Sequence, residues 1–89
     1  MTRHGRAVLS LADRPGFLLV ARIEARGGSV RVTVELNGAP VRSARRPTLT
    51  SGLRWALRVG ERVLDVFGQH AEVVSLQRAY REASAQLAA

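Results

Sequence analysis

The chain contains no cysteine, and that absence removes several kinds of site at once. Disulfide bonds, CxxC redox motifs and thiolate metal ligands all require this residue. Histidine is scarce too: His4 and His70 are the two in the chain, and no HxxxH or comparable spacing occurs. Because a metal centre needs three or four converging ligands, we expect no metal and no other cofactor.

Long apolar runs are also absent. The longest, from Phe17 to Ala21, is far too short to cross a bilayer. Segment 1–12 is basic and then apolar, but its apolar part is short, contains Ser10 and ends at Asp13, unlike a signal peptide. We therefore expect no membrane association and a cytoplasmic location.

The motifs of common reactions are missing as well: the chain has no GxxxxGK[ST] loop, no GxGxxG and no GxSxG. Glu61 and Asp65 lie one helical turn apart and form the best carboxylate pair. Arg58 and Arg62 flank them at salt-bridge spacing, which favours a charged solvent face over acid–base chemistry. We predict no catalytic residues and no enzymatic activity.

Lysine is absent, so all 14 basic residues are arginine, and with seven acidic residues the net charge is +7. Segment 1–46 holds nine arginines and three acids, whereas segment 47–89 holds five and four. The choice of arginine over lysine fits codon bias in a GC-rich genome, which does not explain the net excess. A basic surface of this kind indicates a polyanionic partner.

Alternation is the strongest positive signal. Apolar and polar residues alternate over 17–26 and 29–36, and Gly27-Gly28 between them is typical of a two-residue hairpin turn. Asn37-Gly38 is a second such turn, before a third strand over 39–45 in which Pro40 suits an edge. The sequence predicts a three-stranded antiparallel meander. Residues 7–11, in the arm that precedes it, fit either a short edge strand or one helical turn.

The turns set the register of this meander. The first turn places Glu24 opposite Arg31 and makes every inward-facing pair apolar. The second predicts two pairs between the second and third strands, Thr33 with Arg42 and Val34 with Val41. Arg22, Arg31 and Arg42 would then share the outer face of the sheet.

Two helices should follow the meander. Thr48 or Thr50 can cap a helix over 49–67, Gly60 lies on its apolar stripe, and Gly68 ends it. A second helix is predicted over 70–88. The fold class is therefore α+β in one domain, 1–89, with an arm (1–16), a meander (17–46) and two helices (47–89). Predicted core residues are Leu19, Ile23, Val32, Val34, Leu53, Leu57, Val63 and Leu64.

Two apolar groups remain outside that core. One is a ridge on the first helix, formed by Trp55, Val59 and Val66. The other is a narrow seam on the second helix with the 3-4 spacing of a packing face: Val73, Leu76, Tyr80, Ala83 and Leu87. The seam can pack against the ridge in the same chain or in a second subunit. Because one small sheet cannot cover both, we predict a homodimer, with interface residues Trp55, Val59, Val66, Val73, Leu76, Tyr80 and Leu87.

The predicted function is nucleic-acid binding. The second helix is nearly neutral, which disfavours helix-turn-helix recognition, and the outer sheet face carries no aromatic residue on which single-stranded bases could stack. An arginine-bearing sheet laid against duplex DNA remains. The predicted phosphate-binding residues are Arg22, Arg31, Arg42, Arg45 and Arg46.

Over residues 17–67 the predicted topology resembles that of AP2-type and tyrosine-integrase arm-binding domains. The resemblance implies insertion of the sheet in the major groove and matches no motif residue. Double-stranded-RNA-binding domains share a related order, but the basic cluster that they present is missing from 48–53. The alternative is a protein-interaction module that forms homo-oligomers or docks an acidic protein through its helices.

Overall fold

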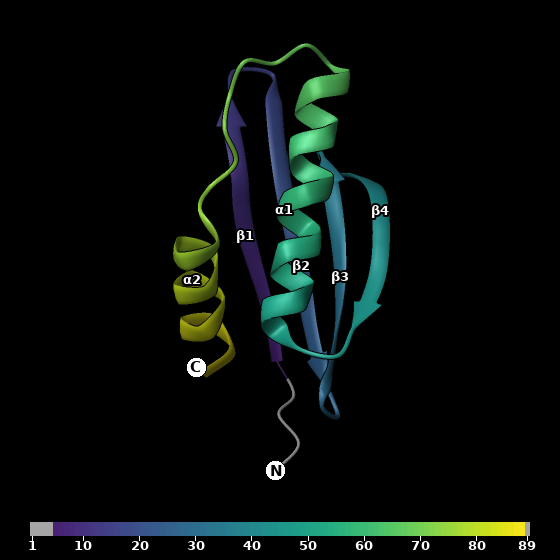
Figure 1. Ribbon diagram of the computed structural model, residues 1–89, viewed down its shortest axis with the longest axis vertical. Coiled ribbons are helices and arrows are strands. Elements are labelled where there is room, and N and C mark those ends of the chain that lie inside the picture. The colour runs from purple at the N-terminus through teal and green to yellow at the C-terminus, as the bar shows by residue number, and fades with distance from the viewer. Residues whose placement is uncertain (1–4, 89) are drawn as a thin grey trace.

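Four antiparallel strands form one sheet in chain order, and two helices follow them (Figure 1). The computed structural model describes residues 5–88. Its elements are β1 (Gly5–Arg14), β2 (Phe17–Arg26), β3 (Ser29–Leu36), β4 (Ala39–Arg46), α1 (Leu49–Val66) and α2 (Leu76–Ala88). The predicted α+β class is confirmed, but the predicted sheet of three strands has four.

The additional strand is β1, in the segment that the sequence left open between an edge strand and a helical turn. Ala7, Leu9 and Leu11 are buried, whereas Val8 and Ser10 between them are exposed. A bulge between Ser10 and Ala12 interrupts this alternation, so that Leu11 and Ala12 are both buried. A turn at Pro15-Gly16 joins β1 to β2. Residues 1–4 of the predicted arm lie outside the described residues.

The register between β2 and β3 is the predicted one. Glu24 lies opposite Arg31, and Ile23 lies opposite Val32. Gly27 and Gly28 both have positive φ, 56° and 86°, as a two-residue turn with the twist of the flanking strands requires.

The register between β3 and β4 is not the predicted one. The ladder shifts by one residue after Glu35, so that Val34 lies opposite Arg42 rather than Val41, and Thr33 lies opposite Ser43. Pro40 has no N–H to give to the ladder, and a bulge with Val41 as the extra residue follows it. The shift exchanges the two faces of β4 from this point to its end.

Local contacts set the start of α1 and its close approach to the sheet. The Thr48 hydroxyl accepts a hydrogen bond from the Ser51 N–H (3.1 Å), and the Ser51 hydroxyl accepts one from the Thr48 N–H (3.2 Å), which completes a capping box. A Cβ added at Gly52 would lie 2.7 Å from Val30 Cγ2, and one at Gly60 3.1 Å from Leu19 Cδ2. These glycines let α1 approach the strands closely.

The second helix begins later than predicted. Residues 70–75 form no helix, and the Val74 N–H donates a hydrogen bond to the Leu11 carbonyl of β1 (3.1 Å). Ser75 precedes the helix, and its hydroxyl accepts a hydrogen bond from the Arg78 N–H (3.1 Å). From there α2 lies along β1 and beside α1 (Figure 1).

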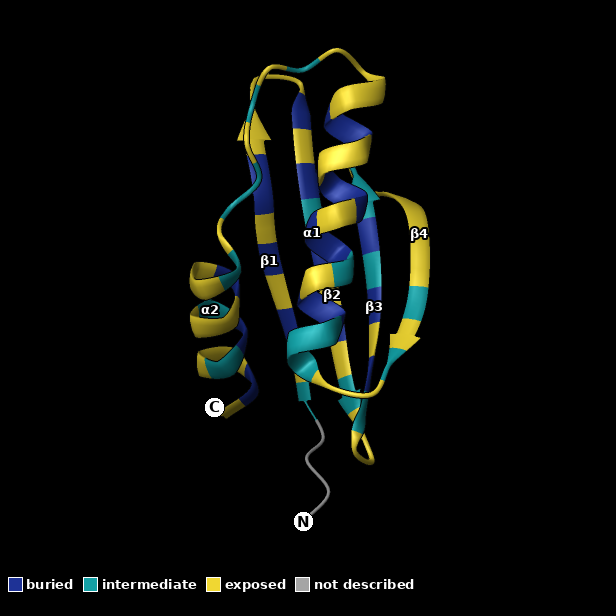
Figure 2. Ribbon diagram, viewed as in Figure 1, coloured by how far each residue is buried: buried dark blue, intermediate teal, exposed yellow. Residues whose placement is uncertain are grey.

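The core lies between the sheet and the helices, as the dark residues in Figure 2 show. All eight residues predicted for it are buried. Within residues 5–88 no element covers the opposite, outer face of the sheet (Figure 1). The molecule is elongated along the strands, with extents of 43 × 20 × 19 Å.

Candidate nucleic-acid interface

A row of charged residues crosses the outer face of the sheet near one of its ends. Arg6 pairs with Glu24, Glu24 with Arg31, and Arg31 with Arg45, one residue from each strand. All four side chains are exposed. Opposed residues of antiparallel strands point to the same face, so the row presents three guanidinium groups on one surface.

The hairpin end of β2 and β3 adds to this row. Arg26, Ser29 and Arg31 line a shallow depression of about 70 Å³ together with Glu24 and Arg45. The Ser29 hydroxyl donates a hydrogen bond to the Arg26 carbonyl (3.3 Å), which fixes the rim of the turn. We name the cluster formed by Arg6, Arg26, Arg31, Arg45 and Arg46 the basic end.

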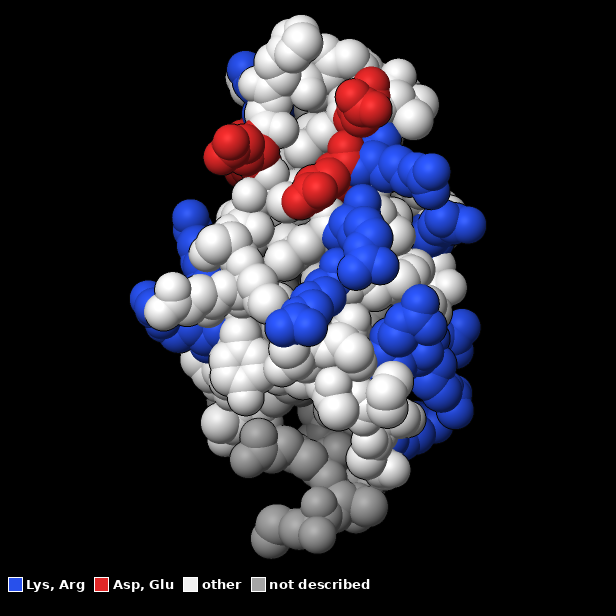
Figure 3. All heavy atoms as spheres, in the orientation of Figure 1, with Lys and Arg blue, Asp and Glu red and all other residues white. Residues whose placement is uncertain are grey.

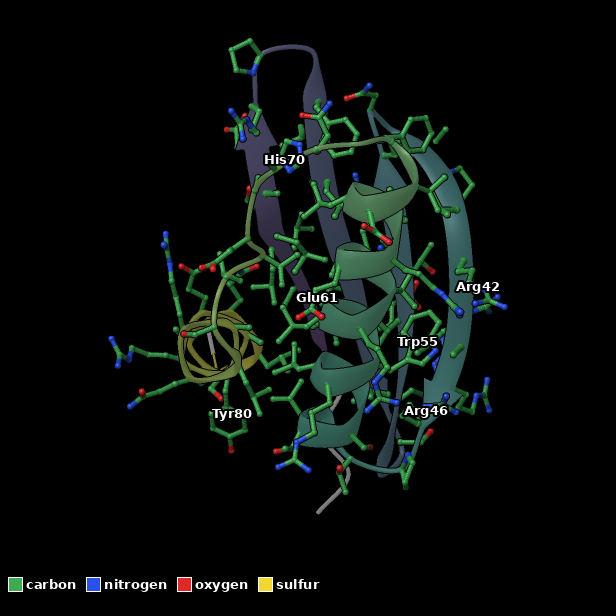
Figure 4. All side chains as sticks on the ribbon, turned by 45° about the horizontal axis from the view of Figure 1, so that its top comes forward. Arg42, Arg46, Trp55, Glu61, His70 and Tyr80 are labelled. Carbon is green, nitrogen blue, oxygen red and sulfur yellow. The ribbon has the colours of Figure 1, made fainter. Side chains whose placement is uncertain are left out.

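Arg46 belongs to the basic end but points to the other side of the sheet. It lies opposite Val30, and its guanidinium carbon is 5.9 Å from the centroid of the Trp55 ring (Figure 4). That distance is within the range of a cation–π contact, which holds the side chain at the start of α1.

Arg22 lies on the outer face, as predicted, but it is already paired. Its Nε donates to Glu35 Oε2 at 2.7 Å, and the Glu35 side chain is only 14% exposed. A guanidinium that neutralises a nearly buried carboxylate has little positive charge left for a ligand. Among residues 5–88 the ion pairs are Arg22–Glu35 and Arg78–Glu82, and neither includes an arginine of the basic end.

Arg42 does not lie on the outer face, and its predicted place there is wrong. The bulge at Val41 turns the Arg42 side chain to the side of the sheet that bears α1. There it lines a groove with Val59 and Arg62 of the helix. The sequence-predicted arginines thus separate into three environments: Arg31, Arg45 and Arg46 at the basic end, Arg22 in an ion pair, and Arg42 in this groove.

Charge is also distributed unevenly along the molecule. On the face shown in Figure 3, acidic side chains gather in the upper half, whereas arginines extend along the β4 side and across α1 below them. Glu61 and Asp65 lie in the last turns of α1, far along the chain from its start beside Arg46.

The predicted dimer residues have mostly intramolecular roles. Val59 and Leu87 are buried, and Trp55, Val73 and Leu76 are half-buried against the core of their own chain. Val66 (76%) and Tyr80 (47%) remain exposed, but they lie on different helices. A homodimer stays a prediction, and its interface is no longer a continuous seam and ridge.

Metal ligands do not converge anywhere in the described part of the chain. No group of three or more histidines or carboxylates within residues 5–88 is placed to hold a metal ion. His70 is exposed, and its carbonyl accepts a hydrogen bond from Arg14 (3.2 Å). Over the same residues, no helix has the length and apolar character needed to cross a membrane.

Sequence reasoning missed Arg6 and gave Arg26 no role. Arg6 joins the site only because β1 brings it beside Glu24, and the alternation of residues 6–11 was the available signal. Arg26 joins it because it lies at the end of β2, opposite Ser29, and lines the same depression as Glu24 and Arg31.

No family model, curated protein or solved structure matches this chain, so its function is inferred from the arrangement of its own residues.

Proposed function

We propose that this protein binds the phosphate backbone of nucleic acid through the basic end, and that the ligand is duplex DNA. The observation that carries the proposal is the row in which Arg31 lies directly opposite Arg45. Like charges opposed across two strands destabilise a sheet, and an anion placed between them removes that repulsion. Guanidinium groups are well suited to such a ligand because they bind phosphate oxygens in a bidentate manner.

The form of the surface favours a duplex over single strands. The outer face of the sheet is uncovered and carries no aromatic side chain among the described residues: Phe17 is buried, and the other aromatics lie on or next to the helices. Bases therefore find no stacking platform there. Phosphates of a duplex, in contrast, need only cations spaced over a broad surface.

The test is salt-dependent binding to a random-sequence duplex by the wild type and by the double variant Arg31→Gln/Arg45→Gln. We expect log affinity to fall linearly with log salt, and the variant slope to be shallower by about 2 units, because each lost phosphate contact removes about 0.9. Loss of affinity should be similar for all sequences, since phosphate contacts carry no base information.

The matched control is Arg58→Gln/Arg81→Gln, which removes the same charge from exposed positions on α1 and α2. The slope of its log affinity against log salt should change much less. An equal change in both double variants would mean attraction to the net charge without a defined site, and wild-type binding that ignores salt would refute the proposal.

A further inference from the structure

Within the described residues, the rest of the chain covers one edge of the sheet and leaves the other edge open. At β1, the Gln86 side chain accepts a hydrogen bond from the Val8 N–H (2.8 Å) and donates one to the Val8 carbonyl (3.0 Å). The Val74 N–H adds a bond to the Leu11 carbonyl (3.1 Å). The residues after α1 thus close this edge by imitating a neighbouring strand.

At the opposite edge, nothing within residues 5–88 pairs with the free side of β4. Beside it, between β4 and α1, runs an open groove of about 230 Å³ with an apolar floor. Three of its residues are strongly exposed for apolar side chains: Val41 (44%), Val66 (76%) and Phe67 (58%). Val59 and Val63 complete the apolar lining. An open strand edge next to an exposed apolar patch is typical of a binding surface.

Charge decides what can occupy this groove. β4 contains three arginines among its eight residues and no acidic residue, and Arg42 and Arg62 are the charged residues that line the groove. Figure 4 shows Arg42 and Arg46 on this side of α1, with Glu61 on the side toward α2. A second copy that paired its own β4 here would place arginines against arginines, which is unfavourable. A segment with carboxylates is attracted to the arginines of β4 and the groove.

We propose that β4 and the groove bind an extended acidic segment of a partner protein by strand addition. In this mode main-chain hydrogen bonds to the free edge supply affinity, and alternate side chains fill pockets that supply specificity. Apolar side chains of the segment enter the groove over Val59 and Val66, and its carboxylates contact Arg42 and Arg62. The groove reaches the end of β4 where β3 turns into it, away from the basic end, so this inference does not depend on the proposed nucleic-acid binding.

The probe is a short peptide of alternating valine and glutamate, with a valine–lysine peptide of the same length as the comparison. Titration followed by amide chemical shifts should show saturable binding of the glutamate peptide, with shifts confined to β4 and the last turns of α1. Amide hydrogen exchange of β4 should slow in the complex, as added strand pairing requires. The lysine peptide should not bind.

Two variants test the two parts of the surface. Val66→Glu changes an exposed residue, so the fold should persist, and we expect affinity for the glutamate peptide to fall by about tenfold or more. Val8→Glu is the matched control, an exposed valine on the outer face of β1, and should bind as the wild type does. Arg42→Glu should shift the preference of the protein from the glutamate peptide toward the lysine peptide. Val66→Glu should still bind duplex DNA with the affinity of the wild type.

Three results would overturn the inference. The first is no saturable binding of the glutamate peptide, or equal binding of the lysine peptide. The second is shifts on the outer sheet face instead of β4. The third is a wild-type dimer that Val66→Glu dissociates, because the occupant of the groove would then be a second copy of this chain.

Discussion

At the scale of single residues, the opposition of Arg31 and Arg45 is the least expected cross-strand pairing in the sheet. Cross-strand neighbours of opposite charge stabilise a sheet, and here only Glu24 supplies one, shared with Arg6 and Arg31. Residues that lower stability and raise affinity for a ligand are common in binding sites.

We therefore expect Arg45→Gln to raise the free energy of unfolding at low salt by about 0.2–1 kcal/mol, the usual size of a cross-strand pair effect. The gain should become smaller as ionic strength rises, because salt screens the repulsion between exposed charges. Denaturant unfolding at several salt concentrations measures it, with Arg81→Gln on α2 as the control. A loss of stability instead would mean that attraction between Arg45 and Glu24 exceeds the repulsion from Arg31.

The bulge at Val41 also explains why Arg42 was predicted on the wrong face of the sheet. Gly27-Gly28 fixed the β2–β3 register, so Arg31 was placed correctly. The bulge at Val41 reversed the faces of β4 beyond it, which moved Arg42 from the predicted outer face to the groove. Pro40 was a signal for it, because a proline disturbs the ladder, but proline alone does not say whether a strand ends or bulges.

At the scale of elements, the closure of β1 by the chain after α1 is the main feature that the sequence did not reveal. Helical periodicity over residues 73–87 predicted a packing seam, of which Ala83 and Leu87 are buried, whereas Tyr80 is exposed and Val73 precedes the helix. The pattern contained no information about which surface the helix meets. The turn at Pro15-Gly16 adds β1 to the sheet, and α2 then packs on β1 rather than on the Trp55 ridge. Long-range pairing of this kind depends on tertiary packing, not on local preference.

Gln86→Ala tests this closure. The change removes both hydrogen bonds to Val8 at an exposed position, so the free energy of unfolding should fall by about 1–2 kcal/mol. Amide hydrogen exchange of Val8 should accelerate well beyond the global effect. Gln77→Ala, on an exposed position of the same helix, should do neither. Unchanged exchange at Val8 would show that α2 packing alone protects the edge.

At the scale of the whole molecule, the fourth strand changes the expectation for self-association. The homodimer was predicted because three strands could not cover both helical stripes. With β1 present, Ala79, Ala83 and Leu87 of α2 are buried within one chain. Leu76 also packs against the core of its own chain.

Leu76→Arg distinguishes the two roles of the seam. We expect it to lower the free energy of unfolding by about 1–3 kcal/mol, because it places a charge against a packed apolar surface. Circular dichroism during denaturation, with sedimentation of both proteins, measures stability and mass together. If the wild type is a dimer and Leu76→Arg is a monomer of unchanged stability, the seam is the subunit interface after all.

The bond between Val8 and Gln86 joins residues 78 positions apart, and this has a consequence for synthesis. The ribosome makes β1 before the residues that cover its edge. Chains grow at roughly 5–20 residues per second, so the newborn sheet spends seconds with two unpaired borders instead of one. A product released before α2 emerges keeps both. An unfinished copy of this protein therefore exposes the same edge of β1 that Gln86 and Val74 cover in the folded chain.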